Sequence, residues 1–458
     1  MKIKNIIILS LLLLGGCKNF LNVQPQGEVI PTTDEEFAAI IHTRLQNIEG
    51  GEDDNVIGNM ETISLLEGIA DNLDANIKAG NLALYSGTEI NKWQTNWKEI
   101  FEIIRDCNIV IENIEGRTSE TARGSLKAAY SMKAICYYNL LRIFCQPWDE
   151  GTKITQDGLP LIDRFDIMDM PVRANMEETF GYIDGLFSQA INVGKVEDLY
   201  FFNDNILKIY QAKLYFWCEK WDSCIKVCED LVNNSGYSLT GISDYEAMIQ
   251  AEYQAKGEVI VRSHINDASE LDWYFTYLEG YIGSRPVGAQ LVKLFGTDPT
   301  KDVRYNLSFD KKRFNTKTPE ARVRLSEAVL MLSEAYYHKN DDVNALKWLN
   351  ELRKNRIEGV IDYQLNTLPK VTTDNKIIVD ALGKSLEPLI QAIFHERQKE
   401  LYMEGDRWFE LKRNGSPQWW IINNAMKYTT VKYLYTAPIF KGDIDINPKI
   451  KQNPGYES

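Results

Sequence analysis

Two short patterns in the chain come close to catalytic or phosphate-binding motifs, but each lacks a required residue. His395-Glu396 begins the HExxH pattern, in which two histidines one helical turn apart bind zinc, but Lys399 occupies the position of the second histidine. Gly383-Lys384-Ser385 ends like a phosphate-binding loop, yet Ile378 stands where the first glycine must be. Without that glycine the backbone cannot wrap around a phosphate. Neither pattern predicts a metal or nucleotide site.

A third pattern has the spacing of the start of a calcium-binding loop. Asp443, Asp445 and Asn447 stand at the first three ligand positions. However, Pro448 replaces the glycine of the turn and Pro454 replaces the bidentate carboxylate. No GxSxG elbow occurs, and nothing singles out one of the four histidines as a base. The sequence therefore predicts no catalytic residue, no metal ligand, no cofactor and no enzyme.

Cys17 follows a short apolar leader that could direct its modification. Lys2 and Lys4 supply a basic start, residues 6–14 are almost all apolar, and Gly15-Gly16 precede the thiol. The apolar run is too short to span a bilayer and has the length of a secretion signal. The arrangement resembles a bacterial lipobox, and the alternative is a plain signal with a chance cysteine. We expect residues 1–16 to be a lipoprotein signal peptide and Cys17 to carry the lipid anchor.

The amino-acid composition of the chain argues against some classes of binding partner. The chain has 51 basic and 65 acidic residues, a net charge of −14, which argues against nucleic acid and against docking on anionic lipid. Hydrophobic residues make up 44% of the chain and charged residues 25%, so the bulk should fold as a globular protein. Aromatic residues make up 11%, and exposed aromatic rings can stack on sugars and peptides.

Helix pairs dominate the pattern of apolar residues. Between Val323 and Arg356, apolar residues recur every three or four positions on both sides of Asn340, a residue that tolerates the left-handed conformation ending a helix. Segments 134–138, 212–216 and 333–337 align without gaps, each starting with a small residue and ending with two aromatics. Antiparallel helix pairs are the unit of repeat arrays. The uneven spacing of the units predicts a mainly all-α fold with long irregular insertions.

The cysteines other than Cys17 are even in number, which allows disulfides in an exported protein. Extending the alignment of the helix pairs places Cys224 and Cys228 at packing positions, and Cys136 aligns with other packing residues. Free cysteine is among the most buried residue types. We therefore expect free thiols in the core, with a bridge or a metal site as the alternative.

The chain divides into a tether and one large domain. Residues 17–33 contain two prolines and a glycine without helical period, and we expect them to form a lipid-anchored extended tether. Residues 34–458 then form a helical ligand-binding domain. Two inserted segments, Asp71–Trp97 and Ile265–Tyr305, are rich in turns and aromatics. Loops on a rigid scaffold are where binding sites tend to be built.

The stretch HERQKELYMEGDRWFELKRNG, residues 395–415, resembles the signature ending of the SusD/RagB family of outer-membrane lipoproteins for nutrient uptake. The start of the mature chain, CKNFLNVQPQGEVIPTT, is similar to the family's cysteine, aromatic segment and proline-rich entry. The resemblance to the family extends to residues 97–112, WKEIFEIIRDCNIVIE, and to the segment from Ser284 to Arg304. The resemblance thus runs from the leader almost to the end of the chain.

The resemblance implies a tetratricopeptide-like scaffold whose loops carry a shallow ligand site. It also implies a stable partner, a SusC-like TonB-dependent outer-membrane transporter, over which the protein acts as a lid. The expected location is the outer membrane, lipid-anchored and exposed at the cell surface. Lys18-Asn19-Phe20 lacks the acidic residues that often accompany surface export in this family, so the face of the membrane stays open.

The signature motif itself we interpret as structural. Glu396, Glu400 and Glu404 are spaced by four, which predicts one helical face. Arg397 and Arg407 are close enough to pair with acids of the same hairpin.

Ligand contacts are predicted from loop position and from the chemistry of sugars. A sugar ring offers a weakly polar C–H face to an aromatic ring and hydroxyls to polar groups. The predicted ligand-binding residues are Trp273, Tyr274, Tyr277, Tyr281, Asp71, Asn72 and Tyr85. The alternative is that the aromatics fix the insertion to the helices. Trp419-Trp420 is a second exposed-looking pair.

These features together predict a binding protein that captures an oligosaccharide and delivers it to the transporter without chemistry. A peptide-binding uptake protein on the same scaffold is one alternative, and a scaffold that binds only a protein partner is another. A glycan-cleaving enzyme, the weakest option, would need two facing carboxylates in the cleft.

Overall fold

The computed structural model describes most of the chain after the predicted tether. The described residues are 31–53, 55–74, 90, 93–166, 168–196, 201–251, 256–262, 282–283, 285–423 and 426–456. The predicted signal peptide, Cys17 and most of the tether lie outside them. Within this part of the chain, no helix combines the length and the apolar character needed to cross a bilayer.

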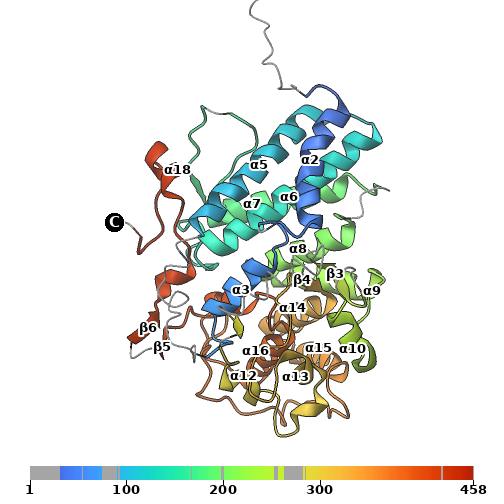
Figure 1. Ribbon diagram of the computed structural model, residues 1–458, viewed down its shortest axis with the longest axis vertical. Coiled ribbons are helices and arrows are strands. Elements are labelled where there is room, and N and C mark those ends of the chain that lie inside the picture. Colours follow the sequence, from blue (N-terminus) through green and yellow to red (C-terminus); the bar gives the residue numbers. More distant parts are fainter. Residues whose placement is uncertain are drawn as a thin grey trace, which may run out of the picture.

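Long helices pack side by side in the N-terminal part, in the upper half of Figure 1. They are α2 (Asp34–Glu49), α5 (Gln94–Ile114), α6 (Glu120–Phe144) and α7 (Met176–Asn192). Helix α2 is capped by Thr33, which forms a capping box with Glu36, the third helical residue. Helix α6 packs on α5, on α7 and on α2. It is buried over most of its length, so it forms the centre of this layer.

Two antiparallel helix pairs continue the array. They are α8 (Asp204–Trp217) with α9 (Trp221–Asn234), and α14 (Leu325–His338) with α15 (Asp342–Lys354). Helix α9 also packs on α14, which joins the two pairs. Asn340 has a φ of 60° in the turn between α14 and α15, so the helix pair predicted around it is confirmed. The described residues are mainly helical, as predicted.

The cysteines of the described residues are packing residues. All of them are free thiols and buried, namely Cys107, Cys136, Cys145, Cys218, Cys224 and Cys228. The Sγ atoms of Cys224 and Cys228 lie 3.9 Å apart on successive turns of α9. The prediction of free core thiols at Cys136, Cys224 and Cys228 is confirmed.

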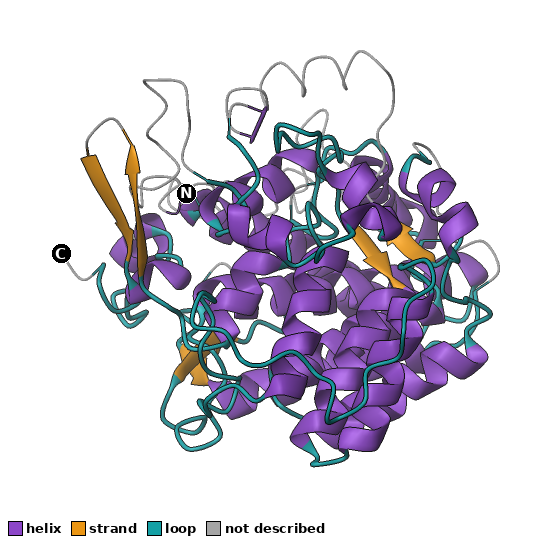
Figure 2. Ribbon diagram, turned by 90° about the horizontal axis from the view of Figure 1, so that it is seen from below, coloured by secondary structure: helices purple, strands orange, loops and turns teal. Residues whose placement is uncertain are grey.

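Short two-stranded antiparallel sheets lie among the helices. They are β1 (Asp157–Pro160) with β2 (Arg173–Asn175), β3 (Val259–Arg262) with β4 (Arg322–Arg324), and β5 (Trp419–Asn423) with β6 (Met426–Thr430). Val259 pairs with Arg324 in the second sheet, and Trp419 pairs with Thr430 in the third. The β5–β6 hairpin projects from the helical body at the left of Figure 2.

Shorter elements fill the space around these pairs. They are α3 (Met60–Ile69), α10 (Ile242–Ile249), α12 (Ala289–Lys293), η4 (Pro299–Lys301), α13 (Val303–Ser308), α16 (Pro388–Glu400), α17 (Arg407–Arg413), η5 (Lys432–Tyr435) and α18 (Lys441–Ile446). The described parts of both predicted insertions include helical segments. Trp97 is buried inside α5, and the described end of the second insertion contains α12, η4 and the start of α13.

A buried ionic cluster surrounds the end of α16. The carboxylate of Glu400 lies 3.0 Å from Arg304, 2.6 Å from Arg324 and 2.9 Å from Arg356, and all four side chains are buried. Burial alone would raise the pKa of Glu400, but the three guanidinium groups hold it well below its usual value. These contacts fix α16 to α13, β4 and the end of α15.

The predicted helical face of three glutamates needs correction at Glu404. Helix α16 ends at Glu400, and Met403 and Gly405 then adopt φ values of 60° and 76°, so Glu404 lies in a turn. Its carboxylate still joins the ionic cluster through Arg324 at 3.0 Å, and it also pairs with Lys317 at 2.8 Å. The predicted pairing of Arg397 and Arg407 within the hairpin is confirmed by their contacts to Asp406 and Glu410.

Candidate ligand-binding sites

Two cavities lie on either side of the turn at 404–407. Glu404, Gly405 and Asp406 line a cavity of 240 Å³, which we call the arginine cavity. Arg407 lines a cavity of 640 Å³, which we call the tryptophan cavity. Helix α3 connects them, because its residues 61–66 line the first cavity and Asp71, just after its end, lines the second.

Adjacent tryptophans of β5 supply the aromatic wall of the tryptophan cavity. Successive side chains of a strand point to opposite faces, so the two rings have different surroundings. Trp419 is 5% exposed, and its Nε1 donates to the hydroxyl of Tyr435 at 3.3 Å. Trp420 is 54% exposed, and Lys427 Nζ lies 4.9 Å from its ring centroid. Trp420 therefore offers an accessible aromatic face.

Paired charges form much of the polar lining of this cavity. Asp71 accepts two hydrogen bonds from Arg407, at 2.7 and 2.9 Å. Arg407 also pairs with Glu410 at 2.7 Å, and the two carboxylates raise the pKa of Arg407 further despite its burial. At the exposed rim, Lys293 Nζ lies 3.7 Å from Asp374. The cavity thus presents polar groups whose charges are largely balanced.

His395 adds a neutral hydrogen-bonding group to the same lining. Its Nε2 lies 3.1 Å from Asn375 Oδ1. Burial, reinforced by the nearby cations Lys399 and Arg407, lowers the pKa of His395 to about 4. The imidazole is therefore neutral at physiological pH, a form that can both donate and accept a hydrogen bond.

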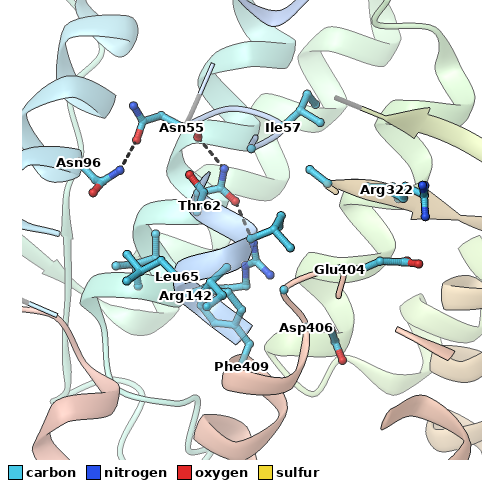
Figure 3. Close-up of a pocket in the computed structure, with 18 of the residues that line it drawn as sticks. Asn55, Ile57, Thr62, Leu65, Asn96, Arg142, Arg322, Glu404, Asp406 and Phe409 are labelled. Atoms are coloured by element: carbon cyan, nitrogen blue, oxygen red, sulfur yellow. Dashed lines mark hydrogen bonds between the residues drawn. The ribbon is translucent and has the colours of Figure 1, made fainter. Parts of the chain in front are cut away.

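The arginine cavity is built where the N-terminal layer meets α3, β4 and the turn at 404–407. Arg142 reaches from α6 between two aromatic rings, with its guanidinium carbon 4.2 Å from the Phe409 centroid and 4.5 Å from the Tyr138 centroid. Its Nη2 donates to Asn139 Oδ1 at 3.0 Å. Figure 3 shows Arg142 beside Phe409, with Thr62 and Leu65 of α3 next to it.

Amides form a hydrogen-bonded chain on another side of this cavity. Asn139 Nδ2 donates to the backbone oxygens of Asn55 and Val56, at 2.8 and 2.9 Å. Asn96 Nδ2 donates to Asn55 Oδ1 at 2.9 Å (Figure 3). Glu61 lies at the rim and is exposed. The cavity therefore has an amide-lined side, an aromatic–arginine side and a mouth to solvent.

Comparison with known proteins places the chain among relatives with this architecture. The family model described as the SusD family matches residues 245–456, the part that contains the ionic cluster and the β5–β6 hairpin. The curated SusD-like protein P25 of Formosa agariphila is 19% identical over the full length of both chains. Residues 245–456 of the chain thus match the SusD family. The fold of the chain is accordingly the tetratricopeptide-like helical fold that was expected.

Solved structures of SusD-like proteins show the same fold at low sequence identity. A SusD superfamily protein of Bacteroides thetaiotaomicron is 19% identical, with a TM-score of 0.68, and the match covers 92% of this chain and all of that one. A laminarin-binding SusD-like protein is 15% identical, with a TM-score of 0.61, and the match covers 94% of this chain and all of that one.

Only part of the predicted ligand site falls within the described residues of the chain. Asp71 lines the tryptophan cavity, where its carboxylate is held by Arg407. Asn72, its neighbour, is fully buried and bonds Glu67 at 2.8 Å and Gln398 at 2.9 Å. A ligand role for either residue stays a prediction. The same holds for the residues that lie outside the described part of the chain, Tyr85, Trp273, Tyr274, Tyr277 and Tyr281.

Several cavity residues carried no signal in the sequence. Arg142 occupies an unremarkable position of a helical pattern, and Lys427, which lies beside the cavity residue Trp420, belongs to no motif. Arg142 becomes notable only when segments far apart in the chain meet, since it lies in α6 and Phe409 lies in α17. Lys427 is brought to Trp420 by the pairing of β5 with β6. The Trp419-Trp420 pair was visible in the sequence, and strand alternation shows that Trp420 is the accessible member.

Proposed function

We propose that this protein binds an oligosaccharide in the tryptophan cavity and delivers it, without chemistry, to a TonB-dependent transporter of the outer membrane. The observation that carries the proposal is the accessible ring of Trp420 beside a polar lining of balanced charge. An aromatic face supplies a large contact area to the C–H face of a sugar at little entropic cost. A cavity of 640 Å³ has the size of a typical small-molecule site.

The charges of the cavity favour a neutral ligand. Asp71 is paired with Arg407, Asp74 with Arg313 at 2.9 Å, and Glu396 with Lys399 at 2.7 Å. Carboxylates held by cations are poorly placed to act as the facing acid and base of a glycosidase. The pairing therefore supports binding over hydrolysis. The solved relative named as laminarin-binding supports a glycan over a peptide.

The membrane part of the proposal depends on the N-terminal sequence. According to the proposal, residues 1–16 are removed as a signal peptide and Cys17 carries the lipid. Residues 17–33 then tether the domain at 34–458 to the outer membrane. The SusC-like transporter as partner follows from the match to the SusD family and the tether. The domain sits at the cell surface in this arrangement, where nutrient capture precedes transport.

Calorimetric titration against a panel of oligosaccharides and peptides tests the proposal. The panel includes β-1,3-glucan oligosaccharides because of the laminarin-binding relative. We expect one glycan class to bind and Trp420→Ala to weaken that binding about tenfold or more, the loss typical of a central aromatic contact. Ile446→Ala, which removes an exposed apolar side chain outside both cavities, is the control and should leave affinity unchanged. Glycan binding that is equal in the two variants would contradict the site, and binding of peptides alone would contradict the ligand class.

A further inference from the structure

Arg142 is a cation without a carboxylate partner in the part of the chain that the structure describes. Among the described residues no Asp or Glu oxygen lies within 4 Å of its guanidinium, and its Nε is buried without a hydrogen-bond partner. The two carboxylates around it are already occupied. Glu327 lies 2.7 Å from Lys213, and Asp406 lies 2.5 Å from Arg397.

Arg142 and the four charged side chains of these two ion pairs, of which Arg397 lies outside the lining, carry one more positive than negative charge. Arg142, Lys213 and Arg397 contribute three positive charges against the two negative charges of Glu327 and Asp406. Of the other charged groups of the lining, Arg322 pairs with Glu320, Glu404 pairs with Lys317 and Arg324, and Glu61 lies exposed at the rim. Removing a charge from water without a partner is costly, so an anion that enters the cavity gains more here than in a site of balanced charge.

The residues around Arg142 indicate the size and chemistry of the rest of the ligand. Phe409 and Tyr138 hold the guanidinium between their rings, which keeps its free edge in place at little further entropic cost. The walls are apolar or aromatic at Trp93 and Tyr210, and the amides of Asn55 and Asn96 also line the cavity. The volume of 240 Å³ is small for a ligand site and has room for about one six-membered ring with its substituents.

We propose that the arginine cavity is a second binding site, separate from the tryptophan cavity, for a one-ring compound that carries a carboxylate. The carboxylate bonds the guanidinium of Arg142, and the ring lies among Trp93, Tyr210 and Leu65, reaching solvent past Glu61. A charged hydrogen bond of this kind is about twice as strong as a neutral one, which gives the site its preference for acids. Acidic sugars and small aromatic acids share this chemistry.

Calorimetry on the purified protein with three probes tests the proposal. D-glucuronate and phenylacetate represent the two sources of a ring carboxylate, and D-glucose is the neutral match to the first. We expect at least one acid to bind at one site per chain, and glucose to bind at least about tenfold more weakly than glucuronate. Binding of glucuronate alone identifies a sugar acid, and binding of phenylacetate alone identifies an aromatic acid. If neither acid binds saturably, or if glucose binds as well as glucuronate, the proposal is wrong.

Variants locate the binding and keep the test valid if one of them fails to fold. Arg142→Met keeps the apolar stem of the side chain and should weaken the acid about tenfold or more. Glu61→Gln removes the exposed carboxylate at the rim and should tighten binding by a small factor, because it removes repulsion. Trp420→Ala should leave acid binding unchanged, which separates this site from the glycan site. Acid affinity that responds to Trp420→Ala and to neither of the other two changes would overturn the assignment.

Discussion

The two cavities share a wall but differ in how their charges are balanced. In the tryptophan cavity, Asp71, Asp74 and Glu396 each lie against a cation, and the accessible ring of Trp420 stands beside them. In the arginine cavity, Arg142 has two aromatic neighbours and no carboxylate within 4 Å among the described residues. Balanced charge suits a neutral ligand and an unbalanced cation suits an acid. The pairing of charges, more than the size of each cavity, distinguishes the ligands.

The difference also reflects how each cavity is built. Residues of the C-terminal half supply most of the tryptophan cavity, including Trp419, Trp420 and residues of α16 such as His395 and Lys399. The arginine cavity takes its lining from α3, α5, α6, α8, β4 and the turn at 404–407. It therefore depends on the relative placement of the N-terminal layer and the C-terminal hairpin. The buried ionic cluster at Glu400 holds α16, which leads into the turn at 404–407, against α13 and β4.

The largest effect is expected from Glu400→Gln, which should disturb both cavities at once. The change leaves Arg304, Arg324 and Arg356 without their shared carboxylate charge, although Glu258 and Asp302 still contact some of them. Removing one partner of a buried ion pair typically costs about 3–5 kcal/mol. We expect a loss of that order in the free energy of unfolding, measured by urea titration at pH 7.5.

Glu351→Gln on the exposed side of α15 is the matched control, and it should change the free energy of unfolding by less than about 0.5 kcal/mol. A loss in Glu400→Gln no larger than that of the control would show that the cluster does not hold the two cavities together.

The sequence predicted the scaffold because helix pairs are local. Apolar spacing around Asn340 and the alignment of Cys224 with packing positions depend on neighbours in the chain, and both predictions are confirmed. The end of α16 was missed because Met403 and Gly405 together adopt left-handed conformations, for which methionine carries no signal. The turn at Glu404, which shapes both cavities, was for that reason predicted as helix.

The sites were less predictable because they are made by contacts between distant segments. Asp71 was predicted from its place at the start of an insertion and lines a cavity, but its partner Arg407 is 336 positions away. Arg142 meets Phe409 across a similar distance, and neither residue belongs to a motif that binds ligands. The single sequence shows which residues could stack or pair. It does not show which charges remain unpaired after folding.

A pH-dependent effect is expected at His395, which belongs to the tryptophan cavity alone. Its pKa in the folded protein is about 4, below the ordinary value of 6.5. Above pH 6.5 the ring is neutral in both states and contributes nothing to the pH dependence. As the pH falls from 6.5 toward 4, the unfolded chain takes up a proton that the folded chain does not, so stability is lost. At pH 5 the loss amounts to about 2 kcal/mol.

His395→Gln removes this loss while it keeps a group that can bond Asn375. The variant should therefore lose less free energy of unfolding than the natural protein between pH 7.5 and pH 5, as measured by urea titration. His42→Gln, on the exposed side of α2, is the control and should follow the natural protein. A difference between His395→Gln and the natural protein that stays constant with pH would show that His395 is not held neutral by the fold.

The smallest effect is expected at Lys427, and it bears on how a sugar meets Trp420. The ammonium group lies 4.9 Å from the ring centroid and covers one face of the indole. A cation–π contact at an exposed site contributes about 0.5–1 kcal/mol, so the contact helps to hold the ring in one orientation. If the sugar stacks on the uncovered face, Lys427→Ala weakens glycan binding about two- to fivefold and leaves acid binding at Arg142 unchanged.

The opposite result would be equally informative. Tighter glycan binding in Lys427→Ala would mean that the ligand must displace the ammonium group from the ring, and that the accessible face of Trp420 is the one Lys427 covers. Lys441→Ala, at an exposed lysine paired with Asp445 on α18, controls for the loss of one positive charge. Comparing the two lysine variants in calorimetry therefore separates ring orientation from general electrostatics. It also fixes the side from which a sugar approaches the tryptophan cavity.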